Sequence, residues 1–405
     1  MICKMRRYRY ASLFLLIFFL FSCATQPPMM EPAGGVTGET HIPVEEPPLP
    51  VIEPEITPPE DYLIIIAVGD NLYHDVMIRS GEDGDYESAY SEIKALVEKA
   101  DIAFINQETL LAGETFGFSG YPTFNSPQKL GQAITATGFN VVNHATNHTM
   151  DKGQNAVFAT MDFWDTIPHV TVLGIHRSEE ERGIPILLQK NNITLGFLSY
   201  TYGTNGLPLP RDKPYLVSLI NNEIMAKEID ALRPLCDFLV VSMHWGEEYQ
   251  HDYNKAQETL AKFLAEHKVD LIIGHHPHVI QPIEYITRPD GEPMLCIYSL
   301  GNLLSAQSMN STLLGALAYI KIKKLPAGDG EAAEIVFADA GAIPLVTHYE
   351  RGYTGFKVYP LYAYSEELLA KHLKNYERLD LTMKYLNETA AKILGDKEIR
   401  NNPFD

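Results

Sequence analysis

Short apolar runs alternate with segments of helical periodicity along most of the chain, starting at Tyr62. The runs are rich in β-branched side chains, which is typical of parallel strands that are covered on both faces. They predict strands at 62–68, 101–105, 139–142, 170–174, 193–199, 237–243, 269–273 and 294–298. Helices are predicted between them at 86–99, 127–137, 153–164 and 254–267. This repeated order of strand, polar loop and helix indicates an α/β layered fold.

The pattern is less regular after residue 313. Further strands are predicted at 314–323 and 334–338, and amphipathic helical periodicity covers 365–394 without a cluster of polar residues. We therefore expect the main domain to cover residues 61–345, and a helical tail, residues 346–405, to pack on it.

The first 60 residues differ in composition from the rest. Four basic residues precede an apolar run at Ala11–Phe21, whose length suits a signal peptide and is too short for a membrane-spanning helix. The next residues, Leu20-Phe21-Ser22-Cys23, resemble a bacterial lipobox, so residues 1–22 are predicted to be a lipoprotein signal peptide and Cys23 the lipidated residue. A plain signal peptide and an uncleaved anchor are the alternatives. Residues 23–60 hold 10 of the 26 prolines and predict a disordered tether to the membrane.

The composition and net charge indicate which kinds of partner the protein can bind. With 45% hydrophobic and 21% charged residues the chain can form a large core. The net charge of −20 argues against nucleic acid as a partner. An acidic protein can still bind an anionic substrate if a metal ion supplies local positive charge. Cys236 and Cys296 are each flanked by strand residues, and we expect free buried thiols there rather than a disulfide, although an extracytoplasmic compartment would permit the bond.

Polar side chains follow directly after many of the predicted strands. They are Asp70, Glu108, Asn147, His148, His244, His276 and His278. If those strands lie side by side in one sheet, their loops converge on one edge, where open α/β sheets bind ligands. Gly274 is expected to end the strand before the three histidines, and Pro277 to hold His276 in an extended conformation.

This set of side chains points to metal chemistry. Carboxylate, amide and imidazole groups together suit one or two transition metal ions rather than calcium, and two ions with a bridging carboxylate can activate water. His148 is the better candidate for a general acid, because a histidine that does not bind metal titrates near neutral pH. The alternatives are a helix cap at Asp70, a solvated acid at Glu108, a core histidine at His244 and solvated loop histidines after residue 274. The chain has no Gly-x-Ser-x-Gly and no phosphate-binding Gly-x-x-x-x-Gly-Lys, so it lacks the signatures of a serine hydrolase and of an ATPase.

A series of short motifs occurs in order over roughly residues 62–305. They are Gly69-Asp70, Asn106-Gln107-Glu108, Asn147-His148 with Asp151 and Gly153, His244-Trp245-Gly246-x-Glu248-Tyr249, Gly274-His275-His276-Pro277-His278-x-x-Gln281-Pro282-x-Glu284, and Ser299-Leu300-Gly301-Asn302. Together they resemble the CapA family, also called PgsA, of poly-γ-glutamate capsule biosynthesis proteins. That family is similar to the calcineurin-like metallophosphoesterases.

The resemblance implies a four-layer α/β/β/α sandwich with a dinuclear site at one sheet edge. Carried over by position, it implies metal ligands at Asp70, Glu108, Asn147, His244, His276 and His278, with His148 as the acid. Positions implied to lie next to the site are His74, Asn106, Glu248, His275 and Asn302. Two residues depart from the phosphoesterase pattern: Leu72 stands where Asp-x-His has its histidine, and Glu108 replaces an aspartate.

Three functions follow as hypotheses. The first is a lipid-anchored protein on the extracytoplasmic face of the cell membrane that serves poly-γ-glutamate production or export with other membrane subunits. The second is a metal-dependent hydrolase of a phosphoester or of the acidic polymer's γ-amide bond. The third is a binding module that has the fold without the chemistry. The first two imply a divalent ion, with Mn, Zn, Fe and Mg all open.

Overall fold

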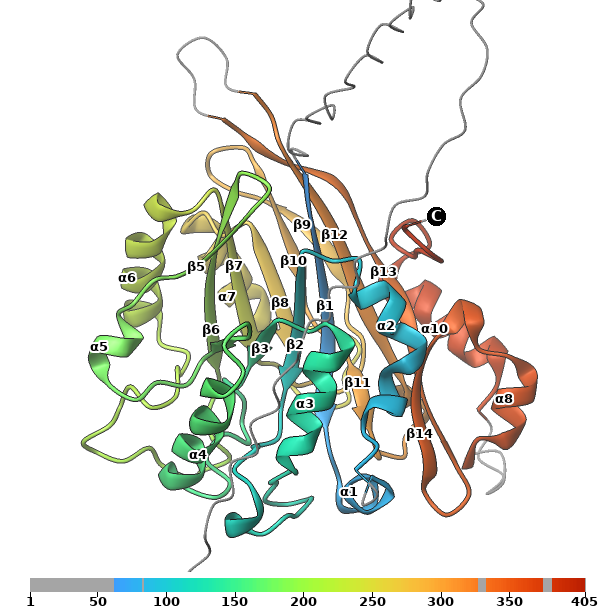
Figure 1. The fold of residues 1–405 in the computed structure, drawn as a ribbon. Helices are drawn as coiled ribbons and strands as arrows, with labels where there is room; N and C mark the ends of the chain where they lie inside the picture. The colour runs from blue at the N-terminus through green and yellow to red at the C-terminus, as the bar shows by residue number, and fades with distance from the viewer. Residues whose placement is uncertain (1–61, 82–83, 327–332, 374–380, 405) are drawn as a thin grey trace, which may run out of the picture. The chain divides into compact units, whose positions relative to one another are not determined.

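This computed structural model describes residues 62–81, 84–326, 333–373 and 381–404 (Figure 1). In this part of the chain the strands form two β-sheets. The first sheet contains, in order, β14 (Thr354–Pro360), β13 (Ile335–Glu350), β12 (Leu314–Lys324), β1 (Tyr62–Leu72), β2 (Ile102–Gln107), β3 (Val141–Asn143) and β4 (Thr171–Leu173), with β11 (Asn302–Ser305) also paired to β1. The second contains β5 (Ile186–Lys190), β6 (Ile193–Thr201), β7 (Phe238–His244), β8 (Leu271–His275), β10 (Pro293–Ile297) and β9 (Ile283–Thr287). The predicted signal peptide, Cys23 and the tether lie outside the described residues.

Helices connect the strands. They are α1 (Asp75–Ser80), α2 (Ser91–Val97), α3 (Gln128–Thr137), α4 (Gln154–Asp165), α5 (Glu179–Arg182), α6 (Asn222–Leu232), α7 (Lys255–Glu266), α8 (Glu366–Lys371) and α10 (Met383–Leu394). The capping box of α7, in which Asn254 and Gln257 exchange hydrogen bonds, shows why that helix begins at Lys255. No helix among the described residues is long and apolar enough to span a membrane.

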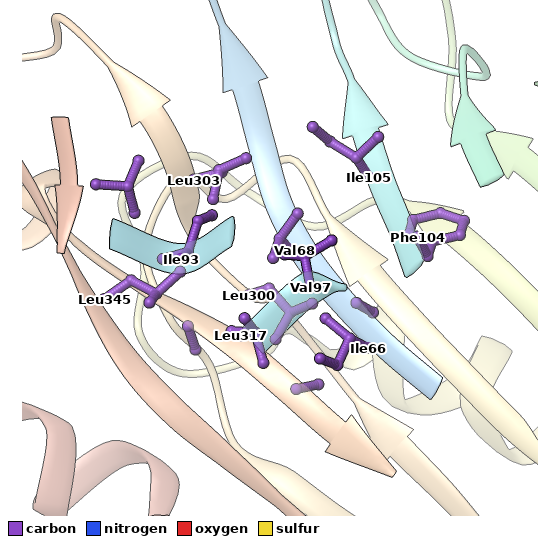
Figure 2. Close-up of a cluster of buried hydrophobic side chains, with 14 of the residues drawn as sticks. Ile66, Val68, Ile93, Val97, Phe104, Ile105, Leu300, Leu303, Leu317 and Leu345 are labelled. Atoms are coloured by element: carbon purple, nitrogen blue, oxygen red, sulfur yellow. The ribbon is translucent and has the colours of Figure 1, made fainter. Parts of the chain in front are cut away.

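Buried apolar side chains join the two sheets into one core. Ile66 and Val68 of β1 pack with Leu317 of β12 and with Val97 of α2 (Figure 2). Each fully buried side chain of this kind contributes roughly 1.5–3 kcal/mol relative to exposure. The same core also contains Phe197 of β6, so it extends to the second sheet.

Alternation along β7 shows that the second sheet is covered on both faces. Phe238 and Val240 belong to the core shared with the first sheet, whereas Leu239 and Val241 pack in a second cluster with side chains of α6 and α7. Because successive side chains of a strand point to opposite faces, the helices and the first sheet lie on opposite faces of the second sheet. This is the pattern that four α/β/β/α layers require, and the α/β prediction is confirmed.

Every predicted strand is present, and the strands are divided between two sheets, as the four-layer sandwich requires. The strands that precede the polar loops therefore do not all lie side by side in one sheet. The structure differs from the prediction in two other places. The helical tail predicted from residue 346 is wrong at its start, because β13 continues to Glu350 and β14, with alternate residues buried, adds a further strand to the first sheet. Gly274 does not end β8, which continues to His275. Cys236 and Cys296 form no disulfide within the described part of the chain, as predicted, but only Cys296 is buried and Cys236 is half-buried.

Candidate metal centre

The candidate ligands come from the carboxyl ends of strands in both sheets. Strands β1, β2 and β3 are parallel neighbours in the first sheet, and β7 and β8 are parallel neighbours in the second. Asp70 lies near the end of β1, and Glu108 follows β2 directly. His244 is the last residue of β7, and His276 follows β8. The site therefore forms where the edges of two sheets meet, rather than at the edge of one.

Among the described residues, three overlapping groups of side chains have ligand atoms within 4.8 Å of one another. They are Glu108 with His244 and His276, Asp70 with Glu108 and His278, and Glu248 with His276 and His278. All of these residues are buried except Glu248. Glu108 belongs to two groups, which is the position that a carboxylate bridging two ions would occupy.

Asp70 is fixed by hydrogen bonds on both oxygens. Asn106 Nδ2 donates to Oδ1 at 2.8 Å, and the backbone N–H of His276 donates to Oδ2 at 3.3 Å. His278 Nδ1 lies 3.0 Å from the same Oδ2. Asn143 Nδ2 in turn donates to Asn106 Oδ1 at 2.7 Å. Asn106 therefore orients Asp70 in this structure.

Glu108 is the unusual member of the centre. Both of its carboxylate oxygens are buried, and neither has a hydrogen-bond partner among the described residues. The Nε2 atoms of His244 and His278 each lie 3.8 Å from Glu108 Oε1. His244 Nδ1 and His276 Nδ1 are also buried without a partner. A buried polar atom left unpaired costs about 1–3 kcal/mol, so several together need a physical explanation.

A divalent ion fits this arrangement. Carboxylate oxygen and neutral imidazole nitrogen are the ligands that Mn, Fe and Zn ions take in proteins, and an ion would provide the partner that these atoms lack. Burial, together with the neighbouring His276, lowers the pKa of His244 well below its usual range. Burial lowers the pKa of His276 to about 3. Both rings are therefore neutral at pH 7, which is the form that binds metal.

Near the two carboxylates of the centre, by contrast, neighbouring charges oppose the effect of burial on two of the pKa values. Burial raises the pKa of Glu108 well above its usual range. Burial opposes charge on His278 too, but Glu108 and the hydrogen bond to Asp70 outweigh it and raise the His278 pKa to about 9. Burial likewise opposes the charge on Asp70, and the hydrogen bond from His278 still lowers the Asp70 pKa. Asp70 and His278 thus form a buried ion pair that a bound cation would have to replace.

The backbone at the histidines is strained. His276 has φ of +99° and His278 has φ of +58°, so the extended conformation predicted for His276 is wrong. The positive φ accompanies the hydrogen bond from the His276 amide to Asp70, a tertiary contact that outweighs the local preference before proline. Gly274 lets the strand approach its neighbour, since a Cβ there would lie 2.0 Å from the carbonyl oxygen of Tyr298. Strained backbone of this kind concentrates at functional sites.

Asn147 reaches the centre through a histidine. Its Oδ1 lies 2.9 Å from His244 Nε2, and its Nδ2 donates to Asn205 Oδ1 at 3.2 Å. Asn147, a predicted ligand, therefore presents its amide oxygen beside the same His244 nitrogen that approaches Glu108. Asn205 was missed by the sequence analysis, because it stands in an exposed loop after β6 with no strand ending directly before it.

His148 is held by a neighbouring acid. Its Nδ1 lies 2.8 Å from Asp151 Oδ2, and both side chains are buried. The same oxygen accepts the backbone N–H of Phe124 at 2.6 Å, and the Phe124 ring packs edge-on against His148 at 4.6 Å. His148 belongs to none of the three ligand groups. The pairing fixes the ring and leaves Nε2 as its second hydrogen-bonding atom.

The other predicted neighbours of the site are placed differently. Asn302 Oδ1 lies 3.2 Å from His278 Nδ1, so it contacts the centre. His275 Nδ1 lies 3.6 Å from Asp70 Oδ1, but the ring stacks on Phe104 and joins no ligand group. His74 joins none either, since its Nδ1 lies 3.2 Å from the backbone oxygen of Leu72.

Two tyrosines beside the centre were given no role by the sequence analysis. The ring of Tyr202 lies 4.7 Å from that of His276, and the ring of Tyr249 lies 6.1 Å from that of His278. Both are partly exposed, so they line the approach to the buried ligands. Tyr202 directly follows β6, so it could have been predicted in the same way as the histidines, from its place after a strand.

Similarity to solved structures is weak. The NAD nucleotidase NadN of Haemophilus influenzae superimposes with a TM-score of 0.45 at 10% identity, covering 84% of this chain and 63% of that one. A 5'-nucleotidase precursor from Thermus thermophilus gives a TM-score of 0.40 at 14% identity, covering 70% and 54%.

Sequence comparison is more informative. The PGA biosynthesis protein CapA of Bacillus subtilis (strain 168) is 31% identical over 209 residues, which cover 51% of this chain and 53% of that protein. The capsule biosynthesis protein CapA of Bacillus anthracis is 28% identical over 199 residues, covering 47% and 46%. The chain thus spans about half the length of these relatives. The family model described as "Bacterial capsule synthesis protein PGA_cap" matches residues 64–307, so the resemblance found in the motifs is confirmed and the chain belongs to this family.

Proposed function

We propose that the chain is a lipid-anchored protein on the extracytoplasmic face of the cell membrane that serves poly-γ-glutamate capsule biosynthesis or export, and that its buried centre holds one or two divalent metal ions. Membership of the PGA_cap family supports the role in capsule synthesis. The signal-like start and Cys23 support the anchor, and other membrane subunits of capsule synthesis are the expected partners.

The metal part of the proposal depends on one observation above the others. Glu108 presents two buried oxygens without partners, and the nitrogens of two histidines lie 3.8 Å from one of them. Asp70, Glu108, Asn147, His244, His276 and His278 would hold the ions, and Asn147 Oδ1 lies 2.9 Å from His244 Nε2. A bound divalent ion would supply positive charge in a protein whose net charge is −20, which is what an acidic polymer or a phosphoester needs in order to bind.

A second candidate function is hydrolysis of a phosphoester or a γ-amide bond at the same centre. The pairing of His148 with Asp151 favours it, because an acid that orients an imidazole through Nδ1 leaves Nε2 to hold or give a proton. In this function His148 would protonate the leaving group, while the ligand residues would bind and orient the substrate through the metal.

Metal content tests the first proposal. The purified chain should contain Mn, Zn or Fe by elemental analysis, and removal of the metal should lower its melting temperature. His276→Ala should weaken metal binding at least about 10–100-fold, because losing a ligand costs no less than losing a group that supports one. The exposed His169 provides a matched control, and His169→Ala should bind metal like the wild type. If the purified chain contained no metal and added Mn²⁺ and Zn²⁺ did not change its melting temperature, the metal site would be rejected. The non-catalytic binding module would then be the remaining hypothesis.

The hydrolase is tested separately. With a phosphoester or poly-γ-glutamate as substrate, His148→Ala should keep its metal and lose about 10²–10⁴-fold in rate, the usual contribution of a general acid. Full metal occupancy with no hydrolysis of either substrate by the wild type would reject the hydrolase and leave the capsule-synthesis role standing.

A further inference from the structure

One cavity in the described part of the protein lies away from the candidate metal ligands, none of which lines it. It lies beside the end of β4, strand β6 and helices α5 and α6, and its volume is about 180 Å³. An engineered apolar cavity of about 150 Å³ holds a benzene molecule, so this one admits an organic group of about that size or slightly larger.

The lining of the cavity contains both apolar and charged residues. Ile184, Phe197 and Leu198 are among the apolar ones. Among the charged ones, Arg182 Nε donates to Glu228 Oε1 at 2.7 Å. Tyr200 donates its hydroxyl to Glu228 Oε2 at 2.6 Å, so both oxygens of this glutamate are occupied.

One nitrogen of the Arg182 guanidinium, Nη2, is available for a further hydrogen bond. The Arg182 side chain is only 9% exposed, and its Nη2 is buried with no hydrogen-bond partner in the part of the chain that the structure describes. A guanidinium nitrogen in this position lacks an acceptor on the protein side, and leaving a buried charged donor unpaired is costly. The cavity that Arg182 lines is where an acceptor could enter.

The charges that line the cavity favour an anion. Arg182 and Lys227 are positive and Glu228 is negative, which leaves an excess of one positive charge in a chain whose net charge is −20. His176 also lines the cavity, but burial lowers its pKa to about 4, so the ring is neutral at pH 7. Its Nε2 lies 2.9 Å from Ser218 Oγ, which occupies that atom.

We propose that this cavity binds a small organic carboxylate, with the carboxylate group on Arg182 and the apolar body against apolar lining residues such as Leu198. A carboxylate accepts charge-assisted hydrogen bonds from a guanidinium, and its single charge matches the excess of one positive charge. Inorganic phosphate matches less well, because it would bring more negative charge close to Glu228 and would leave the apolar lining residues without a partner. The proposal does not depend on the metal centre.

Hexanoate is the test ligand, and hexan-1-ol is its uncharged counterpart of similar length. Calorimetry on the full chain should show saturable binding of hexanoate, with hexan-1-ol binding at least about tenfold more weakly. Arg182→Gln should weaken hexanoate binding by at least about tenfold as well, since it removes a charged hydrogen bond. Arg177→Gln is the control, because Arg177 pairs with Asp165 and does not line the cavity.

Arg182→Gln also leaves Glu228 without its cation and could unfold the site, so a second variant is needed. Ala231 lines the cavity and is exposed, and Ala231→Trp should block hexanoate while keeping the pair of Arg182 and Glu228. Four results would each overturn the proposal: no saturable binding to the folded wild type, equal binding of hexan-1-ol, tighter binding of inorganic phosphate, or undiminished hexanoate binding in Ala231→Trp.

Discussion

Glu108→Gln separates the metal role of this side chain from any role in folding. The two side chains have nearly the same shape, and both carboxylate oxygens of Glu108 lack partners, so the substitution removes no hydrogen bond. Burial raises the pKa of Glu108, so the uncharged amide of glutamine suits this buried position. We therefore expect the free energy of unfolding of the metal-free protein to change by less than about 1 kcal/mol.

With metal the expectation is different. Loss of a ligand should raise the dissociation constant at least about 10–100-fold. A ligand that binds only the folded state stabilises it by mass action, so at saturating metal the variant should gain about 1.4–2.7 kcal/mol less than the wild type.

Urea unfolding of both proteins, first with a chelator and then over a titration of Mn²⁺, measures both quantities. Glu114→Gln is a suitable control, because Glu114 is an exposed glutamate in the segment that follows β2, and it should respond to metal like the wild type. Equal stabilisation of Glu108→Gln and wild type by metal would refute the assignment of Glu108 as a ligand.

Three further predictions concern other parts of the chain. Burial lowers the pKa of His144 to about 3 in the folded protein, so this group lowers the free energy of unfolding as pH falls below its unfolded pKa of about 6.5. His144→Gln keeps an acceptor for the Trp164 indole. Between pH 7.5 and 4.5, its free energy of unfolding, measured in urea, should fall by about 2–3 kcal/mol less than that of the wild type. Gly274→Ala should destabilise by at least about 1–3 kcal/mol in the same assay, because the new methyl group would meet the Tyr298 carbonyl. Cys23→Ala should move the protein from the membrane to the soluble fraction, and unchanged fractionation would contradict the lipid anchor.

The candidate metal centre could be predicted from the sequence, because its side chains all follow a single rule of placement. Side chains that follow apolar runs collect at the carboxyl ends of strands, and this placed Asp70, Glu108, His244, His276 and His278 without any knowledge of the pairing between strands. The rule could not show that two sheets contribute, since an apolar run has the same pattern in either sheet. It could not show the hydrogen bond from Asn147 to Asn205 either, which depends on the path of the loop after β6.

The backbone of His276 was mispredicted for a physical reason that can itself be tested. The preference for extended structure before proline is local, whereas φ of +99° accompanies the hydrogen bond from the His276 amide to Asp70. Residues held in such sparsely populated conformations cost about 1–3 kcal/mol, and glycine avoids that cost while adding about 0.4–1 kcal/mol of entropy to the unfolded chain.

His276→Gly should therefore be more stable than His276→Ala by about 1 kcal/mol without metal, although both lack the imidazole and should bind metal equally poorly. At His169, which is not among the residues with positive φ, the order should be reversed, with glycine the less stable of the two. Urea unfolding of the four variants in chelator measures both differences. If alanine were as stable as glycine at position 276, the strain at His276 would not exist, and the link between the Asp70 hydrogen bond and the turn of the backbone would have to be abandoned.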